Sequence, residues 1–247
     1  MQLAGTVALV TGGAKRVGRA IALELARAGC NVAVHYRRSR VEAEGVASLI
    51  TDMGRATTLI PAELSDPSSW ATIIERTVDG LGRLDVLVNN ASEFLTETPD
   101  TIEQFNASTW ERMLRVNLVA PVALCHYARR HLEAHGGGKV VNLCDVSADR
   151  PWPDHLAYCA SKAGLVAMTR GLARALAPSI QVNGIAPGIA VFPDAYSADL
   201  RERLTRRVPL GREGTPEEVA RLVRFLVETG DYITGQVIPI DGGRSLL

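Results

Sequence analysis

The sequence has few of the features that mark secreted, membrane-spanning or metal-stapled proteins. Its four cysteines, Cys30, Cys125, Cys144 and Cys159, are far apart and form neither a C-x-x-C pair nor a Cys/His cluster with zinc spacing. No apolar run approaches the roughly 18 residues of a membrane helix, and the N-terminal segment lacks a basic, signal-like start. We therefore expect no metal site, no disulfide framework, no membrane contact and a reducing, cytoplasmic location.

Net charge is absent as well. Lys and Arg total 27, and so do Asp and Glu, which argues against a general binder of nucleic acids or anionic membranes. Lysine itself is rare and occurs only at Lys15, Lys139 and Lys162. A lysine in a chain so dominated by arginine points to a task that arginine performs badly. Apolar residues make up 47% of the 247 residues, which is enough to fill a core.

Short apolar runs alternate along the chain with longer segments of helical periodicity. The runs have strand length and span residues 7–10, 32–34, 57–60, 86–88, 140–143, 182–185 and 237–240. Helices are predicted near residues 16–28, 41–53, 67–81, 108–134, 157–176 and 216–228, the last with Thr215 as its N-cap. This alternation predicts one α/β domain, 1–247, with a doubly wound parallel sheet of about seven strands and helices on both faces.

One stretch breaks this rhythm. Residues 188–213 carry prolines, mixed charge and one short helical piece near 195–207. Such an irregular segment suits a substrate lid over a site.

A glycine-rich turn follows the first apolar run and reads Thr11-Gly12-Gly13-Ala14-Lys15-Arg16-Val17-Gly18. Glycines between a first strand and a helix let the backbone approach a diphosphate, which the helix N-terminus then favours. The pattern is not G-x-G-x-x-G, so a tight turn that needs glycine for backbone reasons alone is the alternative.

The second apolar run ends in His35-Tyr36-Arg37-Arg38-Ser39, where an NAD site usually has an acidic residue. Cationic and hydroxyl groups instead suit the 2′-phosphate of NADPH, which is therefore favoured over NADH. The alternative is a solvated, basic start of the next helix.

Tyr158 and Lys162 stand four residues apart on a predicted helix and so share a face. A phenol with its ordinary pKa near 10 is a poor acid–base catalyst at neutral pH. A neighbouring ammonium lowers that pKa and can also hold the ribose hydroxyls of a nucleotide. The pair therefore predicts a proton donor with its partner; the alternative is a surface helix with a snorkelling lysine.

These motifs in register make the chain similar to the short-chain dehydrogenases/reductases over nearly its full length. The resemblance rests on Thr11-Gly12 with Gly18, Asn89-Asn90-Ala91, Asn117, Tyr158-x-x-x-Lys162, Pro187-Gly188 and Asp241-Gly242-Gly243. It implies a Rossmann fold, a homotetramer and cofactor contacts from Thr11, Gly12, Lys15, Arg16, Val17, Gly18, Glu63, Leu64, Asn90, Ala91, Ser92, Tyr158, Lys162, Pro187, Gly188 and Ile189.

Within that family the details resemble the pteridine reductases. Arg16 replaces a usual glycine, Ser92 and Phe94 follow the Asn-Asn-Ala motif, and Asp145 stands where most members have a catalytic serine. The resemblance implies a pterin slot lined by Arg16, Ser92, Phe94, Asp145, Trp152, His155, Tyr158 and Gly188. The alternatives are a core role for Phe94 and a turn role for Ser92.

The resemblance also implies a mechanism. NADPH would transfer a hydride to a C=N carbon of a dihydropterin or related pterin, such as dihydrobiopterin, dihydromonapterin or dihydrofolate. Tyr158 would donate the proton, Lys162 would tune Tyr158 and bind the ribose, and Asn117 would hold a water that links Lys162 to solvent. Asp145 would hydrogen-bond Tyr158 or supply a proton through water, with a raised pKa. Ser147 is expected to be a loop cap.

Two other functions stay open at this point. One is a general carbonyl reductase of the same fold, such as a 3-oxoacyl-thioester reductase. The other is a non-catalytic sensor that binds NADPH. Asp145 and Arg16 argue against the first, and the intact set of Tyr158, Lys162 and Asn117 argues against the second.

Overall fold

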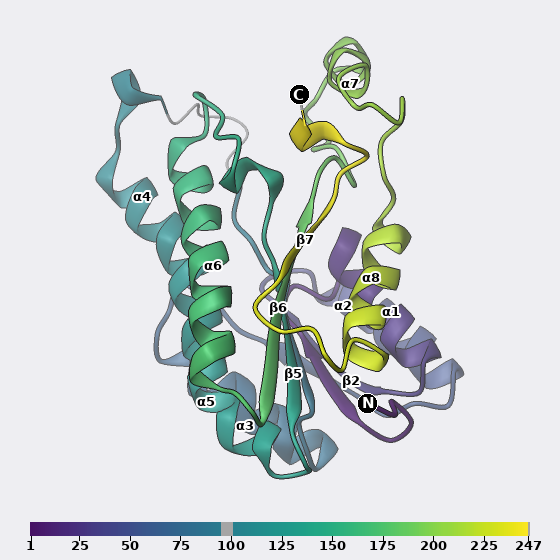
Figure 1. The fold of residues 1–247 in the computed structure, drawn as a ribbon. Coiled ribbons are helices and arrows are strands. Elements are labelled where there is room, and N and C mark those ends of the chain that lie inside the picture. The colour runs from purple at the N-terminus through teal and green to yellow at the C-terminus, as the bar shows by residue number, and fades with distance from the viewer. Residues whose placement is uncertain (95–100, 247) are drawn as a thin grey trace.

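The computed structural model describes residues 1–94 and 101–246, and within them one parallel sheet organises the chain (Figure 1). Its seven strands lie in the order β3-β2-β1-β4-β5-β6-β7. Their bounds are β1 Val7–Val10, β2 Asn31–Tyr36, β3 Thr57–Pro61, β4 Val86–Asn89, β5 Gly138–Leu143, β6 Ile180–Pro187 and β7 Val237–Ile240. The predicted α/β fold with a doubly wound parallel sheet of seven strands is confirmed.

Helices cover both faces of the sheet because the strands are apolar on both faces. Ala8 and Val10 point into a core shared with α1 (Arg16–Arg27), α2 (Arg40–Asp52) and α8 (Pro216–Glu228). Leu9, between them, points into a second core shared with α3 (Ser69–Leu81), α5 (Ala120–Glu133) and α6 (Leu156–Ala175). Alternation at period two on a doubly covered strand therefore builds both cores at once.

The strand order reverses between β1 and β4, and this reversal positions the site. β1 pairs with β2 on one side and with β4 on the other, so that Val10 lies beside both Val34 and Val88. The connections that follow β1 and β4 leave the sheet in opposite directions. A crevice is therefore expected at the carboxyl ends of these two strands, which is where such sheets bind ligands.

One predicted helix differs from the structure. The periodicity predicts a single helix over 108–134, but a π-helical turn, Arg115–Val119, separates α4 (Ala107–Leu114) from α5. The π turn contains Asn117 and widens the helix at that point. The periodicity of apolar residues does not reveal one inserted residue in a long helix, so the sequence alone could not show this turn.

Residues 188–213, predicted to be a lid (the lid segment), and residues 241–246 (the tail) lie together beyond the carboxyl ends of the strands. α7 (Ala198–Thr205) stands apart from the sheet, and the C-terminus lies near it (Figure 1). The Leu210 N–H donates to the carbonyl of Gly242 at 3.1 Å, which joins the two segments. α8 begins as predicted, with the Thr215 hydroxyl and the Glu218 carboxylate forming a reciprocal capping box.

Within the described residues, no helix combines the length and the apolar character needed to cross a bilayer.

Candidate functional site

The glycine turn is hydrogen-bonded to the start of the segment that follows β4. Thr11 is buried, and its hydroxyl oxygen accepts hydrogen bonds from the Asn90 N–H at 2.9 Å and the Ala91 N–H at 3.0 Å. Gly12 has a φ of +63°, and a Cβ built on Gly18 would lie 2.1 Å from the Gly12 carbonyl oxygen. Gly18 therefore lets the first turn of α1 pack directly against the backbone of Gly12. A bare glycine backbone at a helix N-terminus is the arrangement that a diphosphate needs.

Arg16 connects this turn to the lid. Its φ of +51° lies in the left-handed region, which a non-glycine residue occupies at a cost of about 1–2 kcal/mol. Its guanidinium donates to the carbonyls of Val191 at 3.1 Å and Phe192 at 2.7 Å. The Arg16 guanidinium therefore faces the beginning of the lid segment, and its predicted contacts with phosphate and pterin stay a prediction.

His35 is placed differently from the prediction. Its side chain is buried; its Nδ1 accepts from the Gly12 N–H at 3.1 Å, and its Nε2 lies 3.2 Å from the Ala62 carbonyl. These partners fix the neutral tautomer with the proton on Nε2. Burial lowers the pKa of the imidazole to about 4, against smaller opposing effects of Ala62 and Glu63. A ring with both nitrogens bound to protein backbone shapes the turn, and a direct contact with the 2′-phosphate does not fit.

The other residues of the second-strand motif divide between core and surface. Tyr36 is buried, Arg38 is exposed, and Ser39 precedes α2 without a side-chain cap bond. Lys15 pairs with Glu42 at 2.6 Å. Leu64 is buried, and its carbonyl accepts from the Trp70 indole at 2.9 Å.

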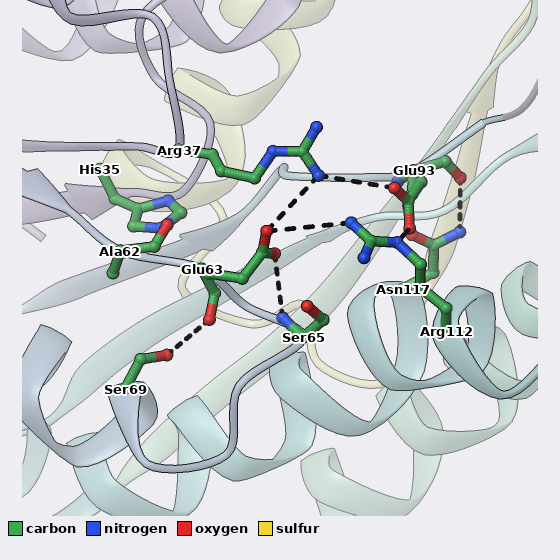
Figure 2. Close-up of polar contacts among 9 residues, drawn as sticks. All are labelled: His35, Arg37, Ala62, Glu63, Ser65, Ser69, Glu93, Arg112 and Asn117. Carbon is green, nitrogen blue, oxygen red and sulfur yellow. Dashed lines mark hydrogen bonds and ion pairs between the residues drawn. The ribbon is translucent and has the colours of Figure 1, made fainter. Parts of the chain in front are cut away.

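Arg37 belongs to a cluster of four charges, Arg37, Glu63, Glu93 and Arg112, whose side chains point toward one another (Figure 2). Arg37 lies 3.6 Å from Glu63 and 3.5 Å from Glu93. Arg112 lies 3.8 Å from Glu63 and 2.7 Å from Glu93. Partial burial opposes ionisation of Glu63, but bonds from Ser65 and the two arginines outweigh it and lower its pKa. The longer contacts of Arg37 make it the more loosely held cation of the cluster.

Asn117 is fully engaged by the protein. Its carbonyl oxygen accepts from the Glu93 N–H at 2.7 Å, and its amide donates to the Glu93 carbonyl at 2.9 Å and the Ser161 hydroxyl at 3.1 Å. Ser161 in turn donates to the Tyr158 carbonyl at 2.7 Å. The amide has no hydrogen left for the predicted water, so a water contact would fall to the backbone of the π turn. The side chain instead holds Glu93 and the residues beside it in place.

Tyr158 and Asp145 form the predicted contact: the phenol donates to the Asp145 carboxylate at 2.9 Å. Burial raises the pKa of Tyr158 well above its ordinary value, and the Asp145 charge adds to the shift while a bond from Ser92 opposes it. Burial also raises the pKa of Asp145, against the opposing effects of Ser147 and Lys162. The pair therefore keeps its proton until a substrate group takes it.

Lys162 does not act on Tyr158 as predicted. Its ammonium is buried, donates to the Leu143 carbonyl at 2.7 Å and lies 5.6 Å from the centre of the Tyr158 ring. The pKa of Tyr158 is raised rather than lowered, because burial and the adjacent Asp145 carboxylate both favour the neutral phenol. Burial lowers the pKa of Lys162 itself, with Asp145 opposing that effect.

An aromatic wall adjoins this pair. Phe94 meets Tyr158 edge-on with ring centres 4.8 Å apart, and it also contacts His155 at 4.6 Å and Trp152 at 6.2 Å. Trp152 lies nearly parallel to the Tyr158 ring, at 6.1 Å. The structure thus brings together four of the residues predicted to line the slot, with Ser92 exposed beside them. A flat aromatic substrate would find stacking partners here.

The start of the lid is held by the tail. The Gly188 N–H donates to the Ile240 carbonyl at 3.1 Å, and a Cβ on Gly188 would lie 2.8 Å from the Asp241 Cβ. Pro187 and Gly188 therefore fix where the chain turns from β6 into the lid. Ile189 lines a cavity of about 290 Å³ between the lid, the tail and α8.

The predicted cap role of Ser147 is wrong: Asp145 is the N-cap of the short turn Val146–Ala148, and its carboxylate accepts from the Ser147 N–H at 2.8 Å, while the Ser147 side chain is buried. Four residues near the site were not predicted, namely Glu93, Arg112, Ser161 and Arg244. The contact of Ser161 could have been predicted from the sequence. Ser161 stands three residues after Tyr158 on the same helix, so its hydroxyl can reach the Tyr158 carbonyl. The others depend on segments distant in sequence.

Known proteins resemble this chain over its whole length. A family model described as enoyl-(acyl carrier protein) reductase matches residues 12–245. The 3-oxoacyl-[acyl-carrier-protein] reductase FabG of Staphylococcus aureus (strain N315) is 35% identical over 240 residues, covering 96% of this chain and 96% of that protein.

Two solved structures are similar at the level of the fold and of the sequence. FolM alternative dihydrofolate reductase 1 from Brucella canis, complexed with NADP, is 37% identical with a TM-score of 0.91 and covers 100% of this chain and 97% of its own. A mutant of a Serratia marcescens short-chain dehydrogenase/reductase is 35% identical with a TM-score of 0.91, covering 99% of this chain and 100% of its own. With the glycine turn at the strand-order reversal and the Tyr158–Lys162 pair beside it, these matches show that the chain belongs to the short-chain dehydrogenase/reductase family.

Proposed function

We propose that the protein is an NADPH-dependent pteridine reductase, which reduces a C=N bond of a dihydropterin to the tetrahydro form. The observation that carries the proposal is the 2.9 Å bond from the Tyr158 phenol to Asp145. A carboxyl group with a raised pKa, next to a phenol, forms a two-step proton path toward a ring nitrogen. The NADP-bound structure of FolM, described as an alternative dihydrofolate reductase, supports the same substrate class.

The residues present fit NADPH. The glycine turn before the N-terminus of α1, with Gly12 at a φ of +63°, suits the diphosphate, and Arg37 and the exposed Arg38 suit the 2′-phosphate. Asn90 and Ala91 are bonded to Thr11 of this turn, and with Ile189 they are further proposed cofactor contacts. When bound, NADPH supplies the hydride.

The protein's own groups then handle the proton. Tyr158 donates its phenolic proton to the substrate nitrogen that becomes basic on reduction. Asp145, already the acceptor of that phenol, returns a proton to Tyr158 from solvent. The Lys162 ammonium donates to the Leu143 carbonyl, and its remaining hydrogens would bind the ribose hydroxyls of the cofactor. Phe94 and Trp152 supply the aromatic face on which the pterin stacks, and residues 188–213 close over it as a lid. A cytoplasmic homotetramer is part of this proposal.

A second candidate is reduction of a 3-oxoacyl thioester, which the similarity to FabG and the matching family model favour. Such a ketone also needs a proton donor, and Tyr158 would serve. The carboxylate of Asp145 argues against it, because a neutral hydroxyl suits a carbonyl oxygen that becomes an oxyanion better than a negative charge does. A third, a sensor without turnover, leaves the buried Tyr158–Asp145 pair without a purpose.

The experiment is a spectrophotometric assay of NADPH oxidation with dihydrobiopterin, dihydromonapterin, dihydrofolate and acetoacetyl-CoA. Turnover with a dihydropterin at a kcat/KM well above that with the thioester is the expected result. Brisk turnover with the thioester and none with any pterin would overturn the proposal in favour of the second candidate. No turnover with any substrate, together with tight NADPH binding, would support the sensor.

Asp145→Asn tests the role of the carboxyl. Asn keeps an oxygen that caps the Ser147 N–H but cannot exchange a proton, so pterin turnover should fall by about tenfold to a hundredfold. Full pterin activity in this variant would remove Asp145 from the proton path.

A further inference from the structure

The C-terminal tail carries a cation to the aromatic wall. The Arg244 guanidinium lies 5.9 Å from the centre of the Trp152 ring. The side chain is half-buried, and its charge interacts with Asp145, Tyr196 and Asp241. Arg244 therefore occupies the outer end of the proposed substrate slot.

A second arginine precedes the three residues that the tail contacts. Arg207 follows α7 and is exposed, and the tail packs against the three residues after it. The Leu210 N–H donates to the Gly242 carbonyl at 3.1 Å, and Cβ atoms built on Gly242 and Gly243 would lie 2.6 Å from Val208 and 3.0 Å from Pro209. Burial lowers the pKa of Arg244, and after the opposing charge of Asp145 the positive charge of Arg207 lowers it further.

The guanidinium groups of Arg244 and Arg207 differ in their pairing from those of other arginines in the same part of the chain. Among the described residues, neither guanidinium makes an ion pair or a side-chain hydrogen bond, whereas Arg206, Arg212 and Arg224 each pair with a glutamate. The acids near Arg244 are already engaged. Asp145 accepts from Tyr158 and Ser147, and the two oxygens of Asp241 accept from the Gly243 and Ser245 N–H groups at 2.9 and 2.6 Å.

We propose that Arg244 and Arg207 form a subsite for an anionic group on the substrate, remote from the reacting ring. Two neighbouring guanidinium groups repel each other until an anion lies between them, and a carboxylate is the group that such a fork binds most directly. The inference rests on the proposed function and sharpens it: the preferred dihydropterin carries a carboxylate tail, as dihydrofolate does, rather than a neutral side chain. A phosphate on an acyl thioester has the same chemistry.

The test compares a charged with a neutral substrate. We would measure kcat/KM for dihydrofolate and for dihydrobiopterin in the wild type and in Arg244→Met, Arg207→Met, Arg244→Lys and Arg206→Met. Arg206→Met is the control for loss of charge. It removes one positive charge at the residue next to Arg207, but the Arg206 guanidinium is already paired with Glu202. Arg244→Met should lower the ratio of dihydrofolate to dihydrobiopterin about tenfold or more, through KM, with Arg207→Met weaker and Arg244→Lys partly restoring it.

An unchanged ratio in Arg244→Met, or an equal fall in Arg206→Met, would overturn the subsite. If Arg244 serves Asp145 alone, both substrates lose activity together and the ratio stays constant, which also overturns it. Should the variants fold poorly, the wild type still tests the idea: KM for dihydrofolate should rise severalfold between about 20 and 200 mM salt while KM for dihydrobiopterin stays level.

The proposed function and the anionic subsite can be tested independently of each other. If the enzyme ignores pterins but reduces acetoacetyl-CoA, the same variants are assayed with acetoacetyl-CoA against neutral ethyl acetoacetate. A fall in that ratio would support the anionic subsite with a phosphate-bearing substrate, and a constant ratio would overturn it.

Discussion

The two ends of the crevice differ in whether their ionisable side chains are exposed to water or buried. Near the end of β2, the four-charge cluster of Arg37, Glu63, Glu93 and Arg112 is partly exposed and mutually paired. Near the end of β5, Tyr158 and Lys162 are buried with Asp145 beside them, and burial is the largest cause of the pKa shift of each.

The difference separates recognition from chemistry. Charges in partial contact with water exchange partners at small free-energy cost, which suits binding of an ionic ligand. Groups removed from water have their protonation state set by their surroundings, which suits proton transfer. Changes at the buried end should therefore alter kcat or stability strongly, and changes at the cluster should alter affinity moderately.

The largest effect is expected from Tyr158→Phe. The variant keeps the ring that contacts Phe94 but has no proton to give, so kcat should fall by about a thousandfold while the Kd for NADPH changes little. Stopped-flow turnover and fluorescence titration of NADPH measure the two quantities. Tyr232→Phe, at a fully exposed tyrosine, is the control. Activity above about a tenth of the wild type would show that another group donates the proton.

The next effect concerns stability at the glycine turn. The pKa of His35 is about 4 in the folded state, below the unfolded value of 6.5, so the unfolded chain binds the extra proton between these values. Stability is therefore lost as pH falls through this window, by about 3 kcal/mol at pH 4 from this residue. Urea unfolding at several pH values measures the slope.

His35→Gln should flatten that slope, because an amide can accept from Gly12 and donate to Ala62 without titrating. His126→Gln, at an exposed histidine, is the control and should leave the slope as in the wild type. An equally steep slope in His35→Gln would assign the acid sensitivity to other groups, so that the buried imidazole would not be its source.

A smaller effect is expected from Arg37→Met. Loss of one charge-assisted contact with the 2′-phosphate should raise KM for NADPH by about tenfold to a hundredfold and leave KM for NADH nearly constant. Glu63→Gln should have the opposite sign and lower KM for NADPH slightly, because Glu63 competes for Arg37. If both cofactors lose affinity equally in Arg37→Met, then Arg37 does not read the phosphate.

The smallest effect is expected from Glu93→Gln. It weakens the 2.7 Å pair with Arg112, and a partly exposed pair contributes at most about 1 kcal/mol. KM for the pterin should rise by about twofold to fivefold, because the Ser92–Phe94 stretch then loses one of the contacts that hold it. A double-mutant cycle with Arg112→Met measures the coupling, and the surface pair Arg129–Glu133 is the control. A coupling energy of zero would show that Glu93 and Arg112 do not stabilise each other and behave as separate solvated charges.

The sequence predicts a residue's role correctly where its contacts are with residues close in the chain, and wrongly where its contacts are with distant segments. The alternation of apolar runs located the strands, and Thr215 with Glu218 predicted a helix start that the structure confirms. His35 was misplaced because the carbonyl of Ala62 and the Gly12 N–H that enclose its ring come from other parts of the chain. The predicted direction of the Tyr158 pKa shift is wrong because burial and the Asp145 carboxylate, which comes from a distant part of the chain, raise this pKa.

By itself, the sequence determined the α/β fold, the position of the glycine turn and the spacing of Asp145, Tyr158 and Lys162. These follow from periodicity and from residue types at short separations, which local backbone geometry translates directly into structure. The tertiary structure decided which groups lose water and which charges meet: the buried phenol on Asp145, the imidazole under Gly12, and Arg244 over Trp152. Burial and pairing depend on segments brought together by the sheet, and no local pattern encodes them.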